Sequence, residues 1–354
     1  MDSQPNIGTF MNSLLYLFEN SININKLELN TIISKTHEFW HNRQKVFKLF
    51  GYFKKIVTEY RAVAPEIMLT VLDRLIVENK LGPIAFITPE IGKWSTVGGL
   101  GVMVDELSKE LAKIGEEVIV VSPYYEYNKK GQTGYLAADG FKYDRNITVW
   151  SAGIKYEIGL HTGKLNGVSY LWLHNSDLFS FPYRGEDAVY VTKQLVFFAL
   201  ASLEAFCQTK VFPSAIVTND WFCGFVSAYV KNGRYPDVFK GTKFMHIVHN
   251  LNPLYEGRLY PKYAEGDLNW LIQLPRDWTI DPDSSKTVIN PSRCALSTSD
   301  NWGTVSHSYK YDLLKESPLS SVLWKYPNPF SFPNGVRRHE RTLILQTKTP
   351  GNHL

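Results

Sequence analysis

The sequence predicts an α/β domain with a doubly wound, mostly parallel sheet and a helical extension ahead of it. Short apolar runs such as Ile84–Ile87 show no alternation, as in strands that are buried on both faces of a parallel sheet. Amphipathic stretches with helical spacing lie between these runs. The order strand, glycine-rich turn, helix, strand over residues 84–124 is the pattern of a βαβ unit.

A glycine-rich turn follows the first predicted strand. The stretch KWSTVGGLGVMVDEL contains three closely spaced glycines: Gly98, Gly99 and Gly101. Apolar residues then recur at helical spacing from Met103 to Ile114, and Gly115 stands where a helix ends. Glycines at a helix start let a ligand approach the backbone amides. A tight turn with close helix packing would need the same glycines, so both interpretations stay open at this point.

The alternation of strands and helices continues further along the chain. Residues 147–175 read as alternating strands divided by Asn166-Gly167, a hairpin turn, and a long apolar helix is predicted over 188–206. Four elements follow in order: strand 214–220, helix 221–233, strand 243–250 and strand 303–309. Polar residues stand at the ends of these strands, where a parallel sheet builds its site: Asn219, Asp220, His249, Asn250, Ser306 and His307.

Composition excludes several classes of function. A net charge of +4, with the lysines scattered along the chain, predicts no nucleic-acid binding. Three widely spaced cysteines predict buried thiols in a reducing compartment, and neither a metal centre nor a cofactor: Cys207, Cys223 and Cys294. The segment 1–25 contains no Lys or Arg, and no apolar run approaches the roughly 20 residues of a membrane helix. We therefore expect a cytoplasmic chain without membrane contact.

Three segments are expected along the chain. Residues 1–81 are rich in Asn, Lys and Glu and carry helical patterning, which predicts a helical extension. Gly82-Pro83 marks the boundary with the sheet domain, predicted over 82–336. Residues 337–354 form a divergent tail.

Several sequence blocks resemble a known enzyme family. The segment ITPEIGKWSTVGGLGVMVDELSKELAKIGEEVIVVSPYY resembles the start of the glycogen and starch synthases, retaining glucosyltransferases of the GT-B fold that carry a KxGGLGDV motif. Its GGLGVM form is also similar to the synthase domain of fungal α-glucan synthases. Further family blocks follow in order: DLFSFPYRGEDAVY, VTNDWFCGFVSAYVK, FMHIVHNLNPLYEG, GTVSHSYKYDLL and FPNGV. The resemblance covers about residues 83–336 and implies the N-terminal Rossmann-like domain of a GT-B enzyme.

The resemblance implies an activity and a set of site residues. The activity is transfer of glucose from ADP- or UDP-glucose to an α-1,4-glucan with retention. One group would contact the donor phosphates and the reacting sugar: Gly98, Gly99, Gly101, Lys93 and Thr96. Asp220 would hydrogen-bond sugar hydroxyls, and His249 would lie near the anomeric centre, where a developing positive charge needs oxygen dipoles. Asn250 would hold that loop, and Tyr183 would contact substrate.

The chain departs from the family at four motif positions. Thr96 replaces the phosphate-binding lysine, for which Lys93 is the candidate substitute, and Val102 replaces the aspartate after GGLG. Phe222 replaces the histidine of HDWH, and Gln194 replaces an arginine. The basic clamp, the KTGGL loop and the glutamate pair of the family's second half have no counterpart after residue 336. We therefore expect an acceptor-side half with a missing C-terminal GT-B domain.

Other interpretations stay open beside this one. The chain could be a catalytically inactive glucan-binding or regulatory module, or an unrelated nucleotide-binding domain that shares the doubly wound sheet. Asp220 is also expected to cap the helix that begins at Trp221, a role compatible with ligand contact. Stacking on sugar rings is possible for four aromatic residues, but core positions are the main expectation for each of them: Trp94, Tyr125, Tyr183 and Tyr190. Structural roles are expected for three histidines: His161, His174 and His246.

Overall fold

The structure, a computed structural model, describes residues 82–333 except for Lys129, Arg184, Glu186, Lys240, Pro253, 283–285 and Pro327. The segments predicted over 1–81 and 337–354 lie outside the described residues, as does the end of the FPNGV block. The predicted division into segments therefore stays a prediction.

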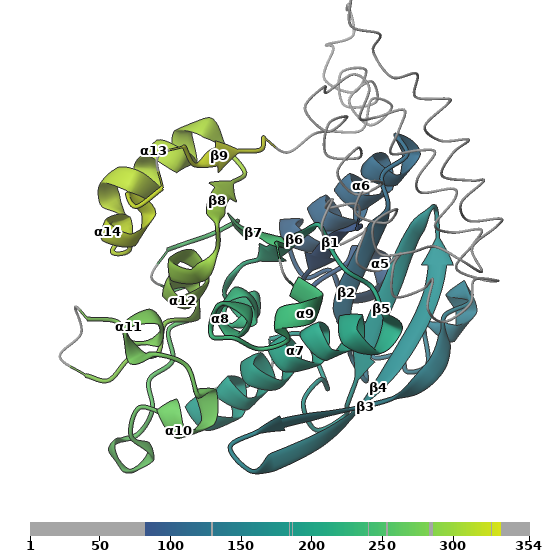
Figure 1. The fold of residues 1–354 in the computed structure, drawn as a ribbon, viewed down its shortest axis with the longest axis horizontal. Coiled ribbons are helices and arrows are strands. Elements are labelled where there is room, and N and C mark those ends of the chain that lie inside the picture. The colour runs from purple at the N-terminus through teal and green to yellow at the C-terminus, as the bar shows by residue number, and fades with distance from the viewer. Residues whose placement is uncertain are drawn as a thin grey trace, which may run out of the picture.

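A nine-stranded sheet forms the centre of the fold (Figure 1), in the order β3-β4-β5-β2-β1-β6-β7-β8-β9. The strands are β1 Ile84–Ile87, β2 Val118–Tyr124, β3 Lys142–Ser151, β4 Ile154–Leu165, β5 Val168–His174, β6 Ala215–Asn219, β7 Lys243–Val248, β8 Asn301–Thr304 and β9 Phe330–Ser331. Neighbours from β5 to β9 pair in parallel, whereas β3, β4 and β5 pair antiparallel. The predicted mostly parallel α/β sheet is confirmed.

Helices cover this sheet and connect its strands. The α-helices are α5 Gly92–Ser95, α6 Gly99–Lys113, α7 Ala188–Thr209, α8 Val226–Lys231, α9 Pro236–Phe239, α10 Asn269–Ile272, α11 Arg276–Thr279, α12 Pro291–Thr298, α13 His307–Glu316 and α14 Ser320–Leu323. The described residues also form three short 3-10 helices: η2 Ala137–Asp139, η3 Trp221–Cys223 and η4 Tyr263–Glu265.

The sheet is doubly wound because α6 and α7 pack on opposite faces. In β1, Phe86 packs in one core cluster with Val104 of α6, while Ala85 and Ile87 pack in another with Phe198 of α7. Successive side chains of a strand point to opposite faces, so one short apolar run serves both layers. The unbroken apolar run in the sequence has this physical cause, and Figure 1 shows the strands lying between the two helices.

Two predicted local features are confirmed in detail. Asn166 and Gly167 both have positive φ values, 51° and 84°, and join β4 to β5 in a hairpin. Gly115, with φ 98°, follows the last residues of α6 and lets the chain turn out of the helix.

Helix α7 is longer and more apolar than the sequence interpretation allowed. Among the described residues it alone has the length, 22 residues, and the composition to cross a membrane. However, 78% of the most apolar stretch of this helix is buried inside the domain, where it packs against the sheet. Burying one Leu or Phe side chain contributes about 1.5–3 kcal/mol, so this helix is a main source of core stability.

The helix predicted over 221–233 is divided in the structure. Residues Trp221–Cys223 form η3, and α8 begins only at Val226. Between them Gly224 lies so close to α12 that an added Cβ would be 2.5 Å from the Pro291 carbonyl oxygen. The close approach of α12 explains the interruption, which the sequence pattern alone did not indicate.

Candidate active site at the carboxyl ends of the strands

The carboxyl ends of β1, β6 and β7 lie at the point where the strand order reverses. The chain leaves β1 for β2 through α6 and reaches β6, on the other side of β1, through α7. Ligands of doubly wound sheets bind at such a switch point. The polar residues that follow these three strands are therefore the candidate site: Glu90, Asn219, Asp220 and His249.

Glu90 is the centre of this group, although the sequence interpretation did not single it out. Its side chain is buried, with 4% exposure, and its Oε2 accepts hydrogen bonds from the backbone amides of Val97 (2.7 Å) and Gly98 (2.9 Å). Its Oε1 accepts a hydrogen bond from the Tyr183 hydroxyl at 2.6 Å. One carboxylate thus joins the end of β1, the glycine loop and the loop ahead of α7.

The three glycines of the loop have different physical roles. A Cβ added at Gly98 or Gly99 would meet nothing within 4 Å. A Cβ added at Gly101 would lie 2.3 Å from the Thr96 Oγ1 and 3.0 Å from the Glu90 Cβ. Gly101 is therefore required by packing, whereas Gly98 and Gly99 leave the backbone bare at the start of α6. The packing interpretation is thus supported for Gly101, and ligand approach at Gly98 and Gly99 stays a prediction.

Thr96, at the position of the family's lysine, ends α5 and carries no charge. Its hydroxyl oxygen is buried without a hydrogen-bond partner among the described residues. The hydroxyl lies in the close contact with Gly101, at the base of the loop.

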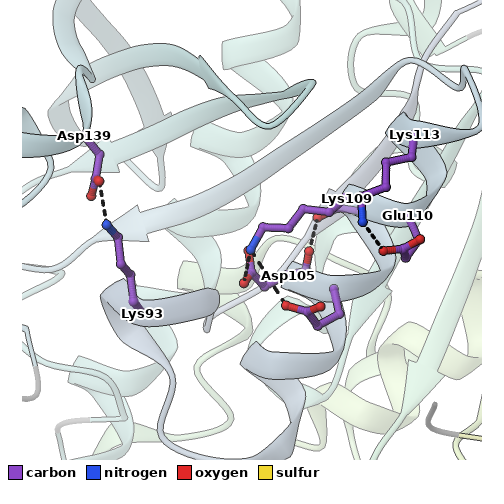
Figure 2. A network of polar contacts seen from close by, with 8 residues as sticks. Lys93, Asp105, Lys109, Glu110, Lys113 and Asp139 are labelled. Atoms are coloured by element: carbon purple, nitrogen blue, oxygen red, sulfur yellow. Dashed lines mark hydrogen bonds and ion pairs between the residues drawn. The ribbon is translucent and has the colours of Figure 1, made fainter. Parts of the chain in front are cut away.

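The ion-pair partner of Lys93 is Asp139, which is not part of the Glu90 group. Its Nζ is 2.5 Å from Asp139 Oδ1, and its side chain is 65% exposed (Figure 2). The other carboxylate oxygen of Asp139 accepts a hydrogen bond from Trp94 Nε1 at 2.7 Å. Burial opposes ionisation of Asp139, but the hydrogen bonds from Lys93 and Trp94 hold its pKa below the usual value. The structure therefore assigns this lysine an ion-pair partner 46 residues away.

The lysines of α6 have partners along their own helix. Lys109 lies 2.6 Å from Asp105, and Lys113 lies 2.5 Å from Glu110 (Figure 2). These pairs occupy the turns that lead away from the glycine loop.

Asp220 does not cap the helix that follows it, so that expectation is wrong. The residue has φ 52°, and its side chain makes no capping hydrogen bond to η3. Instead its Oδ1 accepts a hydrogen bond from the backbone amide of His249 at 2.7 Å, and the amide of Asn250 also donates to this carboxylate. Asp220 therefore holds the loop after the neighbouring strand β7.

The environment of Asp220 favours its neutral form more than usual. Burial raises its pKa to about 7, the two backbone amides oppose this rise, and the negative charge of Glu90 adds to it. The Glu90 carboxylate, which follows β1, thus acts on the Asp220 carboxyl, which follows β6, at the switch point.

His249 is held as a neutral ring. Its Nε2 lies 3.2 Å from Asn219 Oδ1, and burial lowers its pKa to about 4. Asn250, next in the chain, is exposed, and its Oδ1 accepts a hydrogen bond from the Asn252 amide at 3.0 Å. At neutral pH the His249 ring therefore carries no positive charge.

Tyr183 connects the site to the aromatic core. Its ring centroid lies 5.8 Å from that of Trp221, and its φ of 55° is left-handed. Burial and the neighbouring Glu90 raise the pKa of its hydroxyl well above the usual value, so it remains a hydrogen-bond donor. Gly257 closes over Trp221, because a Cβ there would lie 2.4 Å from the indole.

The other family departures lie in the core or on the surface. Phe222 is buried at 1% exposure and packs against Phe198, and Gln194 is buried and donates to the Leu178 carbonyl at 2.5 Å. Val102 is 54% exposed. The aromatic residues expected in the core are buried or partly buried, and Trp94 packs edge-on against Phe141, Tyr170 and Trp172.

The histidines expected to be structural lie outside the site. His246 is fully buried in β7, with Nδ1 2.9 Å from the Thr218 hydroxyl, and burial lowers its pKa to about 3. His161 and His174 pack against Tyr124 with centroid distances of 5.0 Å. Within the described part of the chain, no group of His, Cys, Asp and Glu side chains could hold a metal ion.

Comparison with known proteins identifies the family. The sequence-family model of the starch synthase catalytic domain matches residues 83–325 of this chain. The chain belongs to the starch synthase catalytic domain family. Its sheet also superposes on the catalytic domain of starch synthase IV from Arabidopsis thaliana, a structure bound to ADP and acarbose, with a TM-score of 0.61 at 22% identity. That match covers 72% of this chain and 52% of the other, and it confirms the predicted GT-B N-terminal fold.

Curated relatives extend beyond the matched region. Glycogen synthases from Streptococcus pneumoniae, among them those of strains Hungary19A-6 and CGSP14, are 24% identical over 246 residues. This alignment covers 65% of the present chain and 46% of each relative. The starch synthase domain described here thus spans about half the length of the curated relatives it matches.

Proposed function

We propose that this chain is the acceptor-side half of a starch or glycogen synthase-type glucosyltransferase. The complete enzyme would move glucose from ADP- or UDP-glucose to an α-1,4-glucan with retention, using a second GT-B domain. The family match over residues 83–325 supports the class, and the matched region spans about half the length of the curated relatives. The single observation that carries the proposal is the meeting of Glu90, Tyr183, Asp220 and His249 at the switch point.

The chemistry of these residues suits a glucan. Sugar hydroxyls donate and accept hydrogen bonds, and the site presents carboxylate oxygens, a phenol and a neutral imidazole. A Kd of about 1 mM corresponds to about −4 kcal/mol, which a few hydrogen bonds and one aromatic contact can supply. We expect Asn250, exposed next to His249, to contribute one such hydrogen bond.

A GT-B reaction needs two domains that close over the donor. Closure excludes water and brings cations to the leaving diphosphate. We therefore propose that residues 1–354 alone show no transfer with either nucleotide sugar. A catalytically silent glucan-binding module is the second candidate, supported by the neutral Thr96 and by the pairing of Lys93 with Asp139. A cytoplasmic location remains part of the proposal, supported by the three free cysteines.

Calorimetry with maltohexaose tests the binding part. We expect heat from the wild-type chain in the millimolar range and about threefold weaker binding for Asn250→Ala, the loss of one hydrogen bond. Asn232→Ala is the matched control, because Asn232 is exposed at the end of α8, which runs away from the site edge. Absence of heat at millimolar maltohexaose would contradict both candidates.

Radiolabelled ADP-glucose and UDP-glucose with a glycogen primer test the transfer part. We expect no incorporation from either donor. Incorporation that is lost in His249→Ala would show that this half, or a dimer of it, supplies a complete site.

A further inference from the structure

The loop that follows β7 is attached to the segment ahead of α12. The backbones of Leu259 and Ile289 exchange two hydrogen bonds, of 2.9 and 3.0 Å, and the Ser292 hydroxyl donates to the Glu256 carbonyl at 2.7 Å. The same loop begins with His249, at the edge of the sheet where the candidate site lies. A change in this attachment therefore acts on a loop of the candidate site.

Three buried charged side chains lie at this attachment. Arg258 Nε contacts Glu256 Oε1, and Arg258 Nη2 is 2.9 Å from Asp281 Oδ2. The Glu256 side chain is fully buried, and the side chains of Asp281 and Arg258 are 4% and 20% exposed. One guanidinium thus holds two carboxylates, one from the loop and one from the segment to which the loop is attached.

The group has an excess negative charge when both carboxylates are ionised. Burying a charge without a partner is costly, and a carboxyl group avoids this cost by taking up a proton. Burial raises the pKa of Glu256 to about 6, Arg258 and Asn290 oppose this rise, and the negative charge of Asp281 adds to it. Glu256 therefore changes its charge at mildly acidic pH.

Other charged residues stand on the elements around this group: Asp220, Arg276, Asp277, Lys286 and Arg293. Asp220 accepts a hydrogen bond from the His249 amide, and Arg276 pairs with Asp267. Arg293 Nη2 donates to the Asp277 carbonyl at 3.2 Å, and Lys286 is exposed. The charged groups that shift the pKa of Glu256 are Arg258 and Asp281.

We propose that Glu256, Arg258 and Asp281 form a pH-sensitive latch, which fastens the loop after β7 to the segment ahead of α12 when Glu256 takes up a proton and loosens it when Glu256 ionises. The pKa of Glu256 in the folded chain lies above the ordinary value of 4.5. The stabilisation is therefore complete below about pH 4.5 and is lost as the pH rises through about 6.

The latch is connected to the candidate site through Gly257, which lies between two of its members. A Cβ at Gly257 would lie 2.4 Å from the indole of Trp221. The Trp221 ring centroid is 5.8 Å from that of Tyr183, whose hydroxyl donates to Glu90 at 2.6 Å. Loosening the loop thus loosens packing around the site.

Hydrogen exchange of backbone amides in the full chain, followed by NMR from about pH 5 to about pH 8, tests the latch. The amides of Leu259 and Ile289 report its opening, and the amide of Lys243, which donates to Ser214 at the opposite end of the sheet, is the internal reference. Protection factors, which exclude the intrinsic pH dependence of exchange, should fall at the two reporter amides. The rise in pKa from 4.5 to about 6 corresponds to about thirtyfold in the opening equilibrium, of which about tenfold falls within this pH range.

Two variants assign this fall to the latch. Glu256→Gln keeps the shape of the neutral carboxyl group and cannot ionise, so the fall should be about tenfold smaller than in wild type. Titration of Asp220 is common to both proteins and cancels in this comparison. Asp281→Asn leaves one carboxylate for one guanidinium, so the midpoint of the fall should move to lower pH. Glu110→Gln, at a side chain that is 62% exposed on α6, is the matched control and should behave as wild type.

Two results would overturn the proposal. One is an equal fall in protection in wild type and Glu256→Gln. The other is a midpoint that Asp281→Asn leaves unchanged, which decides the matter even if Glu256→Gln does not fold.

Discussion

Replacing Gly101 by alanine tests whether packing fixes the shape of the glycine loop. An added Cβ would lie 2.3 Å from the Thr96 Oγ1 and 3.0 Å from the Glu90 Cβ. Glu90 is buried and holds two loop amides, so it has little freedom to move away. The φ angle of Gly101 is not in the left-handed region, so the expected penalty is steric rather than torsional.

The magnitude follows from two opposing effects. Overpacking in a closely packed region costs about 1–3 kcal/mol. Alanine is favoured over glycine in a helix by about 1 kcal/mol. Gly101→Ala should therefore lower the free energy of unfolding by up to about 2 kcal/mol. Gly99→Ala, which meets no atom within 4 Å, should leave it unchanged or raise it slightly.

Urea unfolding of the full chain, followed by circular dichroism, measures both variants. The double variant Gly101→Ala with Thr96→Ala should recover part of the loss, because it removes the hydroxyl at 2.3 Å. Equal stability of the Gly101 and Gly99 variants would refute the packing argument, and so would a double variant that recovers nothing.

Three further predictions concern charge and core packing. The folded pKa of Asp220, about 7, lies above the unfolded value near 3.9, so ionisation of Asp220 destabilises the fold as the pH rises from about 4 to about 7. Relative to wild type, Asp220→Asn should therefore become progressively more stable to unfolding as the pH rises from about 4 to about 7, with no further gain above pH 7. Urea titrations at several pH values measure this difference, and a difference that does not depend on pH would contradict the raised pKa of Asp220. Phe222→His, which restores the family residue, should lower the melting temperature more than Phe222→Leu, because it buries a polar ring among aromatic side chains; equal shifts in thermal unfolding would count against it. Lys93→Ala should lower the unfolding free energy by less than about 1 kcal/mol, as for exposed ion pairs, whereas Asp139→Ala should cost more because it also removes the acceptor for Trp94; the reverse order in urea unfolding would show that this assignment is wrong.

The sheet could be predicted well because strands and hairpin turns are marked by patterns of neighbouring residues. Apolar runs without alternation marked β1, β2 and β6, since both faces of these strands are buried. Asn166-Gly167 marked its hairpin because a type of turn with positive φ favours those residues. The division between η3 and α8 was missed because its cause, the contact of Gly224 with Pro291, joins segments far apart in the chain.

Only part of the candidate site could be predicted, because some of its residues are marked by their place at a strand end and others only by partners far away in the chain. Asp220 and His249 were found because they end strands, and the sheet brings strand ends together. Glu90 was missed because a single carboxylate has no motif, and its partner Tyr183 lies 93 residues away. The capping role of Asp220 was wrong because the helix-start rule considers only the following residues, while its partner amide comes from the next strand.

A crystal structure of the chain with maltohexaose is the most direct test of the account. We predict glucose units at the carboxyl ends of β1, β6 and β7, within hydrogen-bond distance of Asp220 or Asn250, with the Glu90 carboxylate still on the amides of Val97 and Gly98. A glucan bound elsewhere on the domain, with this edge of the sheet empty, would contradict the claim that the chain is an acceptor-side half.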